Sequence, residues 1–250
     1  MKVLICGKGG TGKSTLTALL AKELAARGRK VLIIDSDESN FGLPGFLGME
    51  KPNDFMEYFG GKQVLFDRVK TIEQSISSAE LPEAYVTEKG NIRLLAVGKI
   101  YDFGEGCACP INVLAARLLE KRELERNELL IADTDAGVEH LGRGVERGCD
   151  LILAVVEPSR ESRELAMRIA AMVQDLGKEL YYVLNKTDAE TQQVVLGSLP
   201  KDRVIASIPV DKRVSKCGLD GSEFRFGLEG IGRIADFLSQ RARVSQSRGS

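Results

Sequence analysis

The chain has 250 residues, of which 43% are hydrophobic and 28% are charged, a composition typical of a folded globular protein. Its 35 basic and 36 acidic residues give a net charge of −1, so the chain lacks the basic excess of a non-specific nucleic-acid binder. No apolar run is long enough to cross a membrane or to serve as a secretion signal. We therefore expect a cytoplasmic protein with no membrane or nucleic-acid partner, whose five cysteines are thiols.

Strand and helix patterns alternate along the chain. Short apolar runs predict strands at Lys2–Cys6, Val31–Ile34, Ile92–Val97, Leu129–Ala132, Leu151–Val156, Tyr181–Asn185 and Val204–Ile208. Apolar residues at helical spacing predict helices at Lys13–Arg27, Ile111–Arg126, Arg163–Leu176, Glu190–Leu199 and Leu228–Gln240. This succession predicts an α/β fold in three layers, with a mostly parallel twisted sheet and helices on both faces.

Two stretches depart from this alternation. Phe41–Gly90 is polar and irregular, and we interpret it as an insertion with short helices after the second strand. Residues 245–250 are polar and are predicted to be a disordered tail, so that residues 1–244 form a single domain.

A phosphate-binding loop lies between the first strand and the first helix. Residues 7–14 match the pattern G-x-x-x-x-G-K-[ST], in which glycines let backbone N–H groups close around phosphate oxygens. Lys13 is expected to reach the β- and γ-phosphates, and the Ser14 hydroxyl to ligate Mg²⁺. The predicted nucleotide-binding residues of this loop are Gly7, Lys8, Gly9, Gly10, Thr11, Gly12, Lys13, Ser14 and Thr15. The motif and its position together predict a P-loop NTPase.

Aspartates follow two of the predicted strands. Asp35 and Asp37 come after the second strand, and Asp133 ends an apolar strand further along. Carboxylates at the carboxyl ends of parallel strands lie at the ligand-binding edge of the sheet. Asp133 therefore suits the Walker B role of holding Mg²⁺ through water. The alternative for Asp35 and Asp37 is that they cap a turn or a helix.

The second lysine of the loop, Lys8, gives the pattern G-K-G-G-x-G-K-S. This pattern resembles the deviant phosphate loop of the MinD/ParA/nitrogenase-iron-protein class of ATPases. The resemblance implies that Lys8 reaches the partner's nucleotide in an ATP-bound homodimer. It also implies that Asp35 lies near Mg²⁺ and that Asp37 orients the attacking water, so the expected catalytic residues are Lys8, Lys13 and Asp37. The alternative for Lys8 is a solvated loop charge.

Two later motifs resemble the base-binding elements of the same class. Asn185 and Lys186 end a predicted strand, at the place where the class uses an asparagine amide to recognise adenine. Pro209 and Asp211 lie in a segment that resembles the loop beside the base. The resemblance favours ATP, and GTP stays open.

A Cys-x-Cys pair distinguishes this chain within the class. Cys107 and Cys109 lie in a predicted loop, Gly104–Pro110, directly before a helix whose dipole favours thiolates. Zn²⁺, and Ni²⁺ in some sites, commonly binds four ligands, and one Cys-x-Cys pair supplies two thiolates. A symmetric dimer would therefore share one Zn²⁺ or Ni²⁺ at its interface. The alternative is two unrelated loop thiols. Cys6 and Cys149 are expected to be packed inside the protein, and Cys217 to lie in a polar loop.

The segment around Asp133 adds a closer resemblance. It reads Asp133-x-Asp135-Ala136-Gly137-x-Glu139-His140-x-Gly142-Arg143-Gly144, and with the cysteine pair it resembles the CooC-type accessory ATPases. The resemblance implies assistance in nickel insertion into carbon monoxide dehydrogenase or a related client enzyme. His140 is either a metal ligand or a residue that makes structural hydrogen bonds. A MinD/ParA-like positioning ATPase and an iron–sulfur electron-transfer ATPase are the alternative functions.

Overall fold

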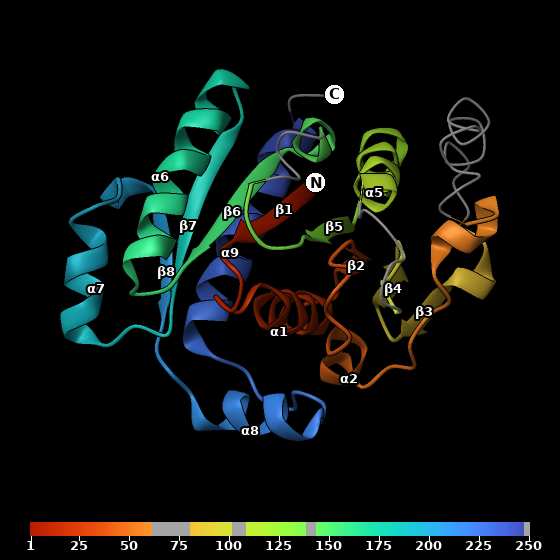
Figure 1. Ribbon diagram of the computed structural model, residues 1–250, viewed down its shortest axis with the longest axis horizontal. Helices are drawn as coiled ribbons and strands as arrows, with labels where there is room; N and C mark the ends of the chain where they lie inside the picture. The colour runs from red at the N-terminus through yellow and green to blue at the C-terminus, as the bar shows by residue number, and fades with distance from the viewer. Residues whose placement is uncertain (62–80, 102–108, 139–143, 248–250) are drawn as a thin grey trace.

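The computed structural model describes residues 1–61, 81–101, 109–138 and 144–247. Within them, eight strands form one sheet in the order β3-β4-β2-β5-β1-β6-β7-β8 (Figure 1). The strands are β1 (Lys2–Gly7), β2 (Lys30–Asp35), β3 (Val86–Lys89), β4 (Ile92–Ala96), β5 (Glu128–Asp133), β6 (Leu151–Val156), β7 (Glu179–Asn185) and β8 (Val204–Ile208). Neighbouring strands are parallel except for β3, which pairs antiparallel with β4 at one edge.

Helices cover both faces of this sheet. The longer ones are α1 (Lys13–Ala26), α5 (Cys109–Lys121), α6 (Arg160–Asp175), α7 (Ala189–Leu196), α8 (Lys212–Asp220) and α9 (Glu229–Ser247). Short helical segments are α2 (Leu43–Leu47), η1 (Phe55–Phe59), η2 (Glu83–Tyr85), η4 (Val145–Gly148) and η5 (Lys201–Arg203). None of the helices in the described residues is both long enough and apolar enough to cross a membrane.

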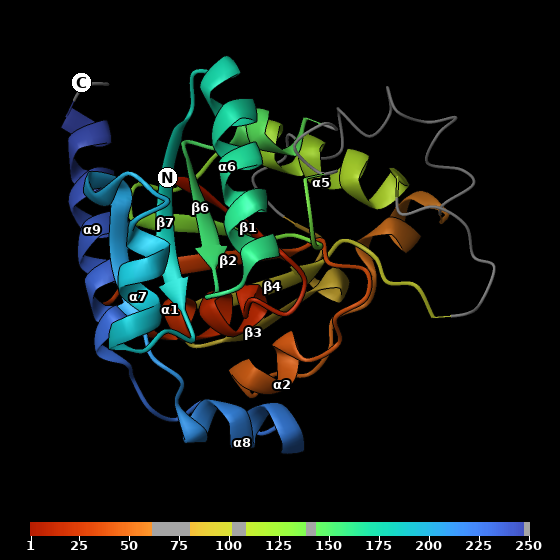
Figure 2. The same ribbon diagram turned by 60° about the vertical axis from the view of Figure 1, so that its left-hand side comes forward.

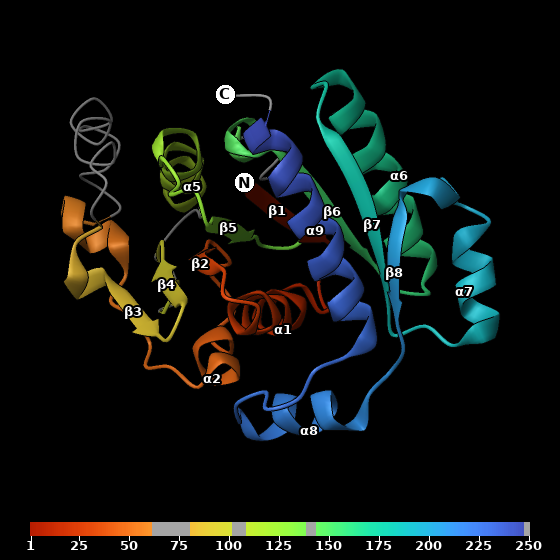
Figure 3. The same cartoon turned by 180° about the vertical axis from the view of Figure 1, so that it is seen from behind.

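The layers follow from alternation along the buried strands. Leu4 and Cys6 of β1 point to one face, where they pack with α5 and α6. Val3 and Ile5 point to the other face, where they pack with α1 and α9. Figure 2 shows α5 and α6 together on one side, and α9 lies behind the sheet in Figure 1 and in front of it in Figure 3. Because both faces are covered, the central strands are apolar throughout rather than alternating.

The predicted three-layer fold is confirmed. Each predicted strand and helix is present, with ends that coincide with the prediction or differ from it by up to seven residues. The polar region after β2 contains the expected short helices, and it also contains β3, which was not predicted. α9 continues to Ser247, into the segment predicted as a tail, and residues 248–250 lie outside the described part of the chain.

The sheet order creates a topological switch point at β1. From β1, the chain goes to one side through β2 and to the other side through β6. In open parallel sheets, ligands bind outside the carboxyl ends of the strands at such a switch point. The carboxyl end of β1, where the phosphate loop starts, is that point.

Candidate functional site

The phosphate loop turns through three glycines with positive φ. These are Gly7 at 148°, Gly10 at 80° and Gly12 at 93°. At two of them a side chain would also collide with the protein. A Cβ on Gly7 would lie 2.5 Å from the Val155 carbonyl oxygen, and one on Gly12 would lie 2.5 Å from Nδ2 of Asn185. The glycines of the motif are therefore required by the close approach of β6 and β7 to the loop.

The start of α1 offers donors for an anion. Gly12 occupies the N-cap position and has no side chain to bond the first N–H groups of the helix. Lys13, the next residue, is only 5% exposed. A helix N-terminus with such a lysine is suited to bind phosphate oxygens.

Two carboxylates meet beside this loop. Asp35 ends β2 and Asp133 ends β5, and the two residues face each other in the parallel register. Burial raises the pKa of Asp35 to about 6, against the opposing charge of Lys99. Burial also raises the pKa of Asp133 to about 7, and the negative charge of Asp35 adds to this shift.

The surroundings of Asp133 fit a hard divalent cation. The residue is 0% exposed, and neither of its carboxylate oxygens has a hydrogen-bond partner of ordinary geometry among the described residues. The nearby Ser14 hydroxyl and Lys13 ammonium offset only part of the rise in its pKa. An orphaned buried carboxylate next to a hydroxyl is a donor set that Mg²⁺ prefers. Ser14 and Asp133, two of the three residues predicted to hold Mg²⁺, therefore fit that role, whereas the third, Asp35, pairs with Lys99.

The loop after β2 brings Asp37 to the same place. Asp37 is 7% exposed, and its Oδ1 accepts hydrogen bonds from the Ser39 amide at 3.0 Å and the Ser39 hydroxyl at 2.7 Å. Asn40, which sequence reasoning missed, donates from Nδ2 to the Ser14 hydroxyl oxygen. The loop is thus joined to the first turn of α1 through a side chain that gave no motif signal.

Lys8 is held within its own subunit. Its ammonium lies 3.0 Å from Oε1 of Glu157, which follows β6, and Lys186 lies 3.5 Å from Oε2 of the same carboxylate. Lys186 also donates to the Gly10 carbonyl oxygen at 2.5 Å. Lys186 is also the only described residue other than glycine with positive φ, at 59°. Glu157 therefore links the phosphate loop to the ends of two strands.

A cavity of about 170 Å³ adjoins the loop on the side of β7 and β8. The nucleotide-site residues that line it were all predicted from the sequence: Gly12, Thr15, Asn185, Lys186, Pro209 and Asp211. Asn185 donates one amide N–H to the Thr11 carbonyl oxygen at 2.7 Å. Asp211 caps α8 and pairs with Arg213, whose hydrogen bond lowers the pKa of Asp211 to about 2. The rest of the lining is largely apolar, with Leu16, Val210 and Val214 among it.

Residues 2–224 match the CobQ/CobB/MinD/ParA nucleotide-binding domain family, also called CbiA. The chain belongs to this family of P-loop ATPases. It is 47% identical over 249 residues to an uncharacterized ATP-binding protein of Methanocaldococcus jannaschii, covering 96% of this chain and 100% of that protein. It is 31% identical over 226 residues to the carbon monoxide dehydrogenase accessory protein CooC of Rhodospirillum rubrum, covering 82% and 85%.

The fold agrees with that assignment. The septum site-determining protein MinD from Pyrococcus horikoshii, solved with Mg-ADP, superposes with a TM-score of 0.71 at 19% identity over 97% of both chains. This likeness establishes a MinD-like arrangement of sheet and helices for the CbiA-family chain.

The cysteines of this family member divide into two groups. Cys6 and Cys149 are buried, as predicted, and burial raises the pKa of each thiol to about 12. The prediction that Cys217 lies in a polar loop is wrong, because it is buried on α8. Cys6 and Cys149 are therefore poor candidates for metal binding, because ligation requires the thiolate.

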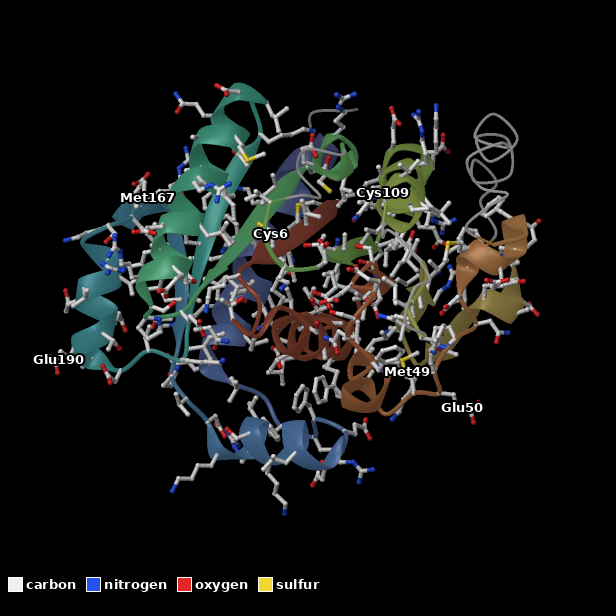
Figure 4. The ribbon with its side chains drawn as sticks, in the orientation of Figure 1. Cys6, Met49, Glu50, Cys109, Met167 and Glu190 are labelled. Atoms are coloured by element: carbon white, nitrogen blue, oxygen red, sulfur yellow. The ribbon has the colours of Figure 1, made fainter. Side chains whose placement is uncertain are left out.

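The predicted metal-binding pair is only partly described. Cys107 lies outside the described residues, as do Glu139, His140, Gly142 and Arg143. The prediction that Cys109 lies in a loop is wrong, because α5 begins at Cys109, with Pro110 in its first turn (Figure 4). The expectation that all five cysteines are thiols is wrong for Cys109, which is disulfide-bonded. A reductant is therefore needed before its sulfur can bind a metal. In the part of the chain that is described, no group of three or more potential metal ligands is found.

Lys99, like Asn40 and Glu157, was not predicted from the sequence. It follows β4, and its ammonium pairs with Asp35 at 2.7 Å, with both side chains 2% exposed. The ATPase site therefore contains a buried cation beside its carboxylates, in addition to the two lysines of the phosphate loop.

Proposed function

We propose that this protein is a Mg²⁺-dependent ATPase whose homodimer binds nickel between its Cys107 and Cys109 pairs and delivers it to a nickel enzyme such as carbon monoxide dehydrogenase. The observation that carries the nickel part is the similarity to CooC, at 31% identity over 82% of the chain. The Cys-x-Cys motif, whose second cysteine begins α5, would provide the thiolate ligands for the metal. Zn²⁺ is the other metal that such a thiolate set accepts.

The site geometry supports the proposed binding and hydrolysis of ATP. Lys13 and the N-terminus of α1 would bind the phosphates, and Asp37 would orient the attacking water. Ser14 and Asp133 would hold Mg²⁺, with Asp35 beside them and fixed by Lys99. When bound, the metal supplies charge neutralisation for the β- and γ-phosphate oxygens.

The homodimer is supported by the exposed position of Lys8. Its side chain is 38% exposed and lies at the rim of the phosphate loop, so it can reach outward once it leaves Glu157. A lysine from the partner subunit would add positive charge where negative charge develops in the transition state. The dimer would at the same time bring two cysteine pairs together.

The base would occupy the cavity lined by Asn185 and Pro209. Its apolar walls suit a flat aromatic ring, and the Asn185 amide provides a polar contact at its edge. We propose adenine as that base, since relatives of this chain bind ATP.

Metal content per subunit tests the nickel proposal. The reduced protein is loaded with NiCl₂ or ZnCl₂ in the presence of Mg²⁺ and a non-hydrolysable ATP analogue and desalted into the same nucleotide, and its metal is measured by mass spectrometry. Wild type is compared with Cys107→Ser/Cys109→Ser and with Cys217→Ala, a matched control at a buried cysteine. We expect about half a metal ion per chain in wild type and in the control, and none in the double variant, because four thiolates complete one site.

Basal ATP hydrolysis of the double variant is expected to equal that of wild type, because neither cysteine belongs to the nucleotide site. Equal metal content in the double variant and wild type would overturn the nickel proposal. Iron with visible absorbance in place of nickel would point to an iron–sulfur protein instead. ATP-dependent binding to vesicles or DNA without metal would point to a positioning ATPase.

A further inference from the structure

The ammonium of Lys99 is buried and fully bonded. Its side chain is 2% exposed, and three oxygens accept its N–H groups: Asp35 Oδ2 at 2.7 Å, the Asp37 carbonyl at 2.5 Å and the Asn40 carbonyl at 2.6 Å. A buried charge is stable only where such partners replace water. Because all three donors are used, this position is built for an ammonium rather than for an apolar side chain.

The backbone that carries Lys99 is anchored as well. The Lys99 amide donates to Asp54 Oδ2 at 3.0 Å, and the Met56 amide donates to the Val97 carbonyl oxygen at 2.9 Å. The ammonium is therefore presented from a fixed segment at the carboxyl end of β4. Its partners, by contrast, all belong to residues 35–40, the loop that leaves β2.

Residues 35–40 carry much of the chemistry proposed above. Asp37 would orient water, Asn40 holds the Ser14 hydroxyl, and Asp35 lies opposite Asp133 in the sheet. Without the ammonium, the Asp35 carboxylate and the Asp37 and Asn40 carbonyl oxygens would each lose an N–H donor in a site largely closed to water. The loop would then have to move to satisfy them, and its side chains would move with it.

We propose that Lys99 is a positioning residue for ATP hydrolysis: it holds residues 35–40 in the conformation that aims Asp37 and Asn40 into the nucleotide site. Its ion pair with Asp35 leaves Asp133 as the carboxylate available to the cation. Lys99 reaches the reaction only through this loop. The proposal rests on the hydrolytic function proposed above.

The test compares Lys99→Met with Arg122→Met. Arg122 is a matched control because it also forms a buried ion pair, with Glu128, at the opposite end of the strands. Both variants are expected to melt at a lower temperature. We expect only Lys99→Met to lower kcat, by at least about tenfold, because misplaced groups cost that much or more. KM for ATP should change less than about threefold, since Lys13 and the helix N-terminus remain.

A second pair of variants separates positioning from simple charge neutralisation. Lys99→Met/Asp35→Asn removes both charges of this ion pair, so it is expected to fold even if Lys99→Met does not. If Lys99 holds the loop through the Asp37 and Asn40 carbonyls, kcat of the double variant is at least about tenfold below that of Asp35→Asn. Equal kcat values for these two variants would overturn the proposal, as would an equal loss of kcat in Arg122→Met.

Hydrogen exchange tests whether Lys99 holds residues 35–40 without depending on ATP hydrolysis. In the ADP complex, amides of residues 37–40 are expected to exchange at least about tenfold faster in Lys99→Met than in wild type. Unchanged exchange would show that Lys99 does not hold the loop. Suppose that exchange of residues 37–40 is faster in Lys99→Met but wild type does not hydrolyse ATP. Lys99 would then hold the loop, and the proposed hydrolytic function would be refuted instead.

Discussion

Asp133 is an acid in surroundings that oppose its ionisation. Burial raises its pKa from an ordinary value of 3.8 to about 7, and the neighbouring Asp35 contributes to the rise. A carboxyl group whose pKa is higher in the folded state favours folding at low pH. This contribution is lost as pH rises from 3.8 through about 7, because the folded protein must then hold a buried charge.

The pH dependence of stability tests this reading of Asp133. Asn is neutral at every pH, so Asp133→Asn removes the charge but keeps the shape. Without metal or nucleotide, we expect the melting temperature of the variant relative to wild type to be higher at pH 8 than at pH 5. An exposed control that does not titrate, Gln174→Ala, should show no such change with pH. A constant difference between Asp133→Asn and wild type would contradict the assignment.

Magnesium should change which of the two proteins, wild type or Asp133→Asn, has the higher melting temperature at pH 8. Mg²⁺ with ADP is expected to raise the melting temperature of wild type more than that of Asp133→Asn, because the cation relieves the buried charge. ATP hydrolysis by the variant should fall by about a hundredfold or more. Equal stabilisation of both proteins by Mg²⁺ would place the cation elsewhere.

Which site residues were predictable depends on whether their signal is local. The phosphate loop is a contiguous motif, and the structure shows why Gly7 and Gly12 are glycines. Lys99 is 64 residues from Asp35 and stands at the end of an ordinary apolar strand, so nothing in its neighbourhood announces a buried ion pair. Asn40 lies just before the irregular segment Phe41–Gly90 and belongs to no recognisable motif.

At the scale of elements, Glu157 joins the ends of three strands. It follows β6, contacts Lys8 after β1 and contacts Lys186 after β7. Proximity to both lysines lowers the pKa of Glu157, although its partial burial acts in the other direction. If Lys8 serves the partner subunit, this contact competes with dimer formation.

Glu157→Gln should therefore favour the dimer. We expect the ATP-dependent dissociation constant, measured by sedimentation, to fall by about two- to fivefold, the range of a partly exposed ion pair. The effect should shrink at high salt. Glu164→Gln, which breaks the exposed pair with Arg160 on α6, serves as the control and should leave the constant unchanged. A weaker dimer in Glu157→Gln would show that Glu157 supports the interface instead.

The elements that prediction missed have weak patterns. β3 is a four-residue edge strand in a polar region, with only Val86 as a strongly apolar residue. On α8, Cys217 is the buried residue and charges dominate the rest, so its sequence looks like a loop. The start of α5 was placed too late because Pro110 looks like a loop residue, although proline is favoured in a first helical turn.

At the scale of the whole molecule, alternating apolar strands and amphipathic helices were sufficient to predict the fold. They specify a parallel sheet covered on both faces, and the sheet order then places the carboxyl ends of β1, β2 and β5 side by side. The phosphate loop, Asp35 and Asp133 meet there for that reason. How two chains meet could not be derived in this way, because a single chain contains only half of the proposed metal site.

The central claim is that ATP binding creates a dimer with one shared metal. The measurement uses reduced Asp37→Ala, expected to bind ATP without hydrolysing it, incubated with Mg²⁺, ATP and NiCl₂. Mass by sedimentation equilibrium and nickel content are determined on the same sample. The account predicts a dimer with about one nickel per two chains, and monomers without ATP. A monomer carrying one nickel per chain, or an ATP-dependent dimer without nickel, would contradict it.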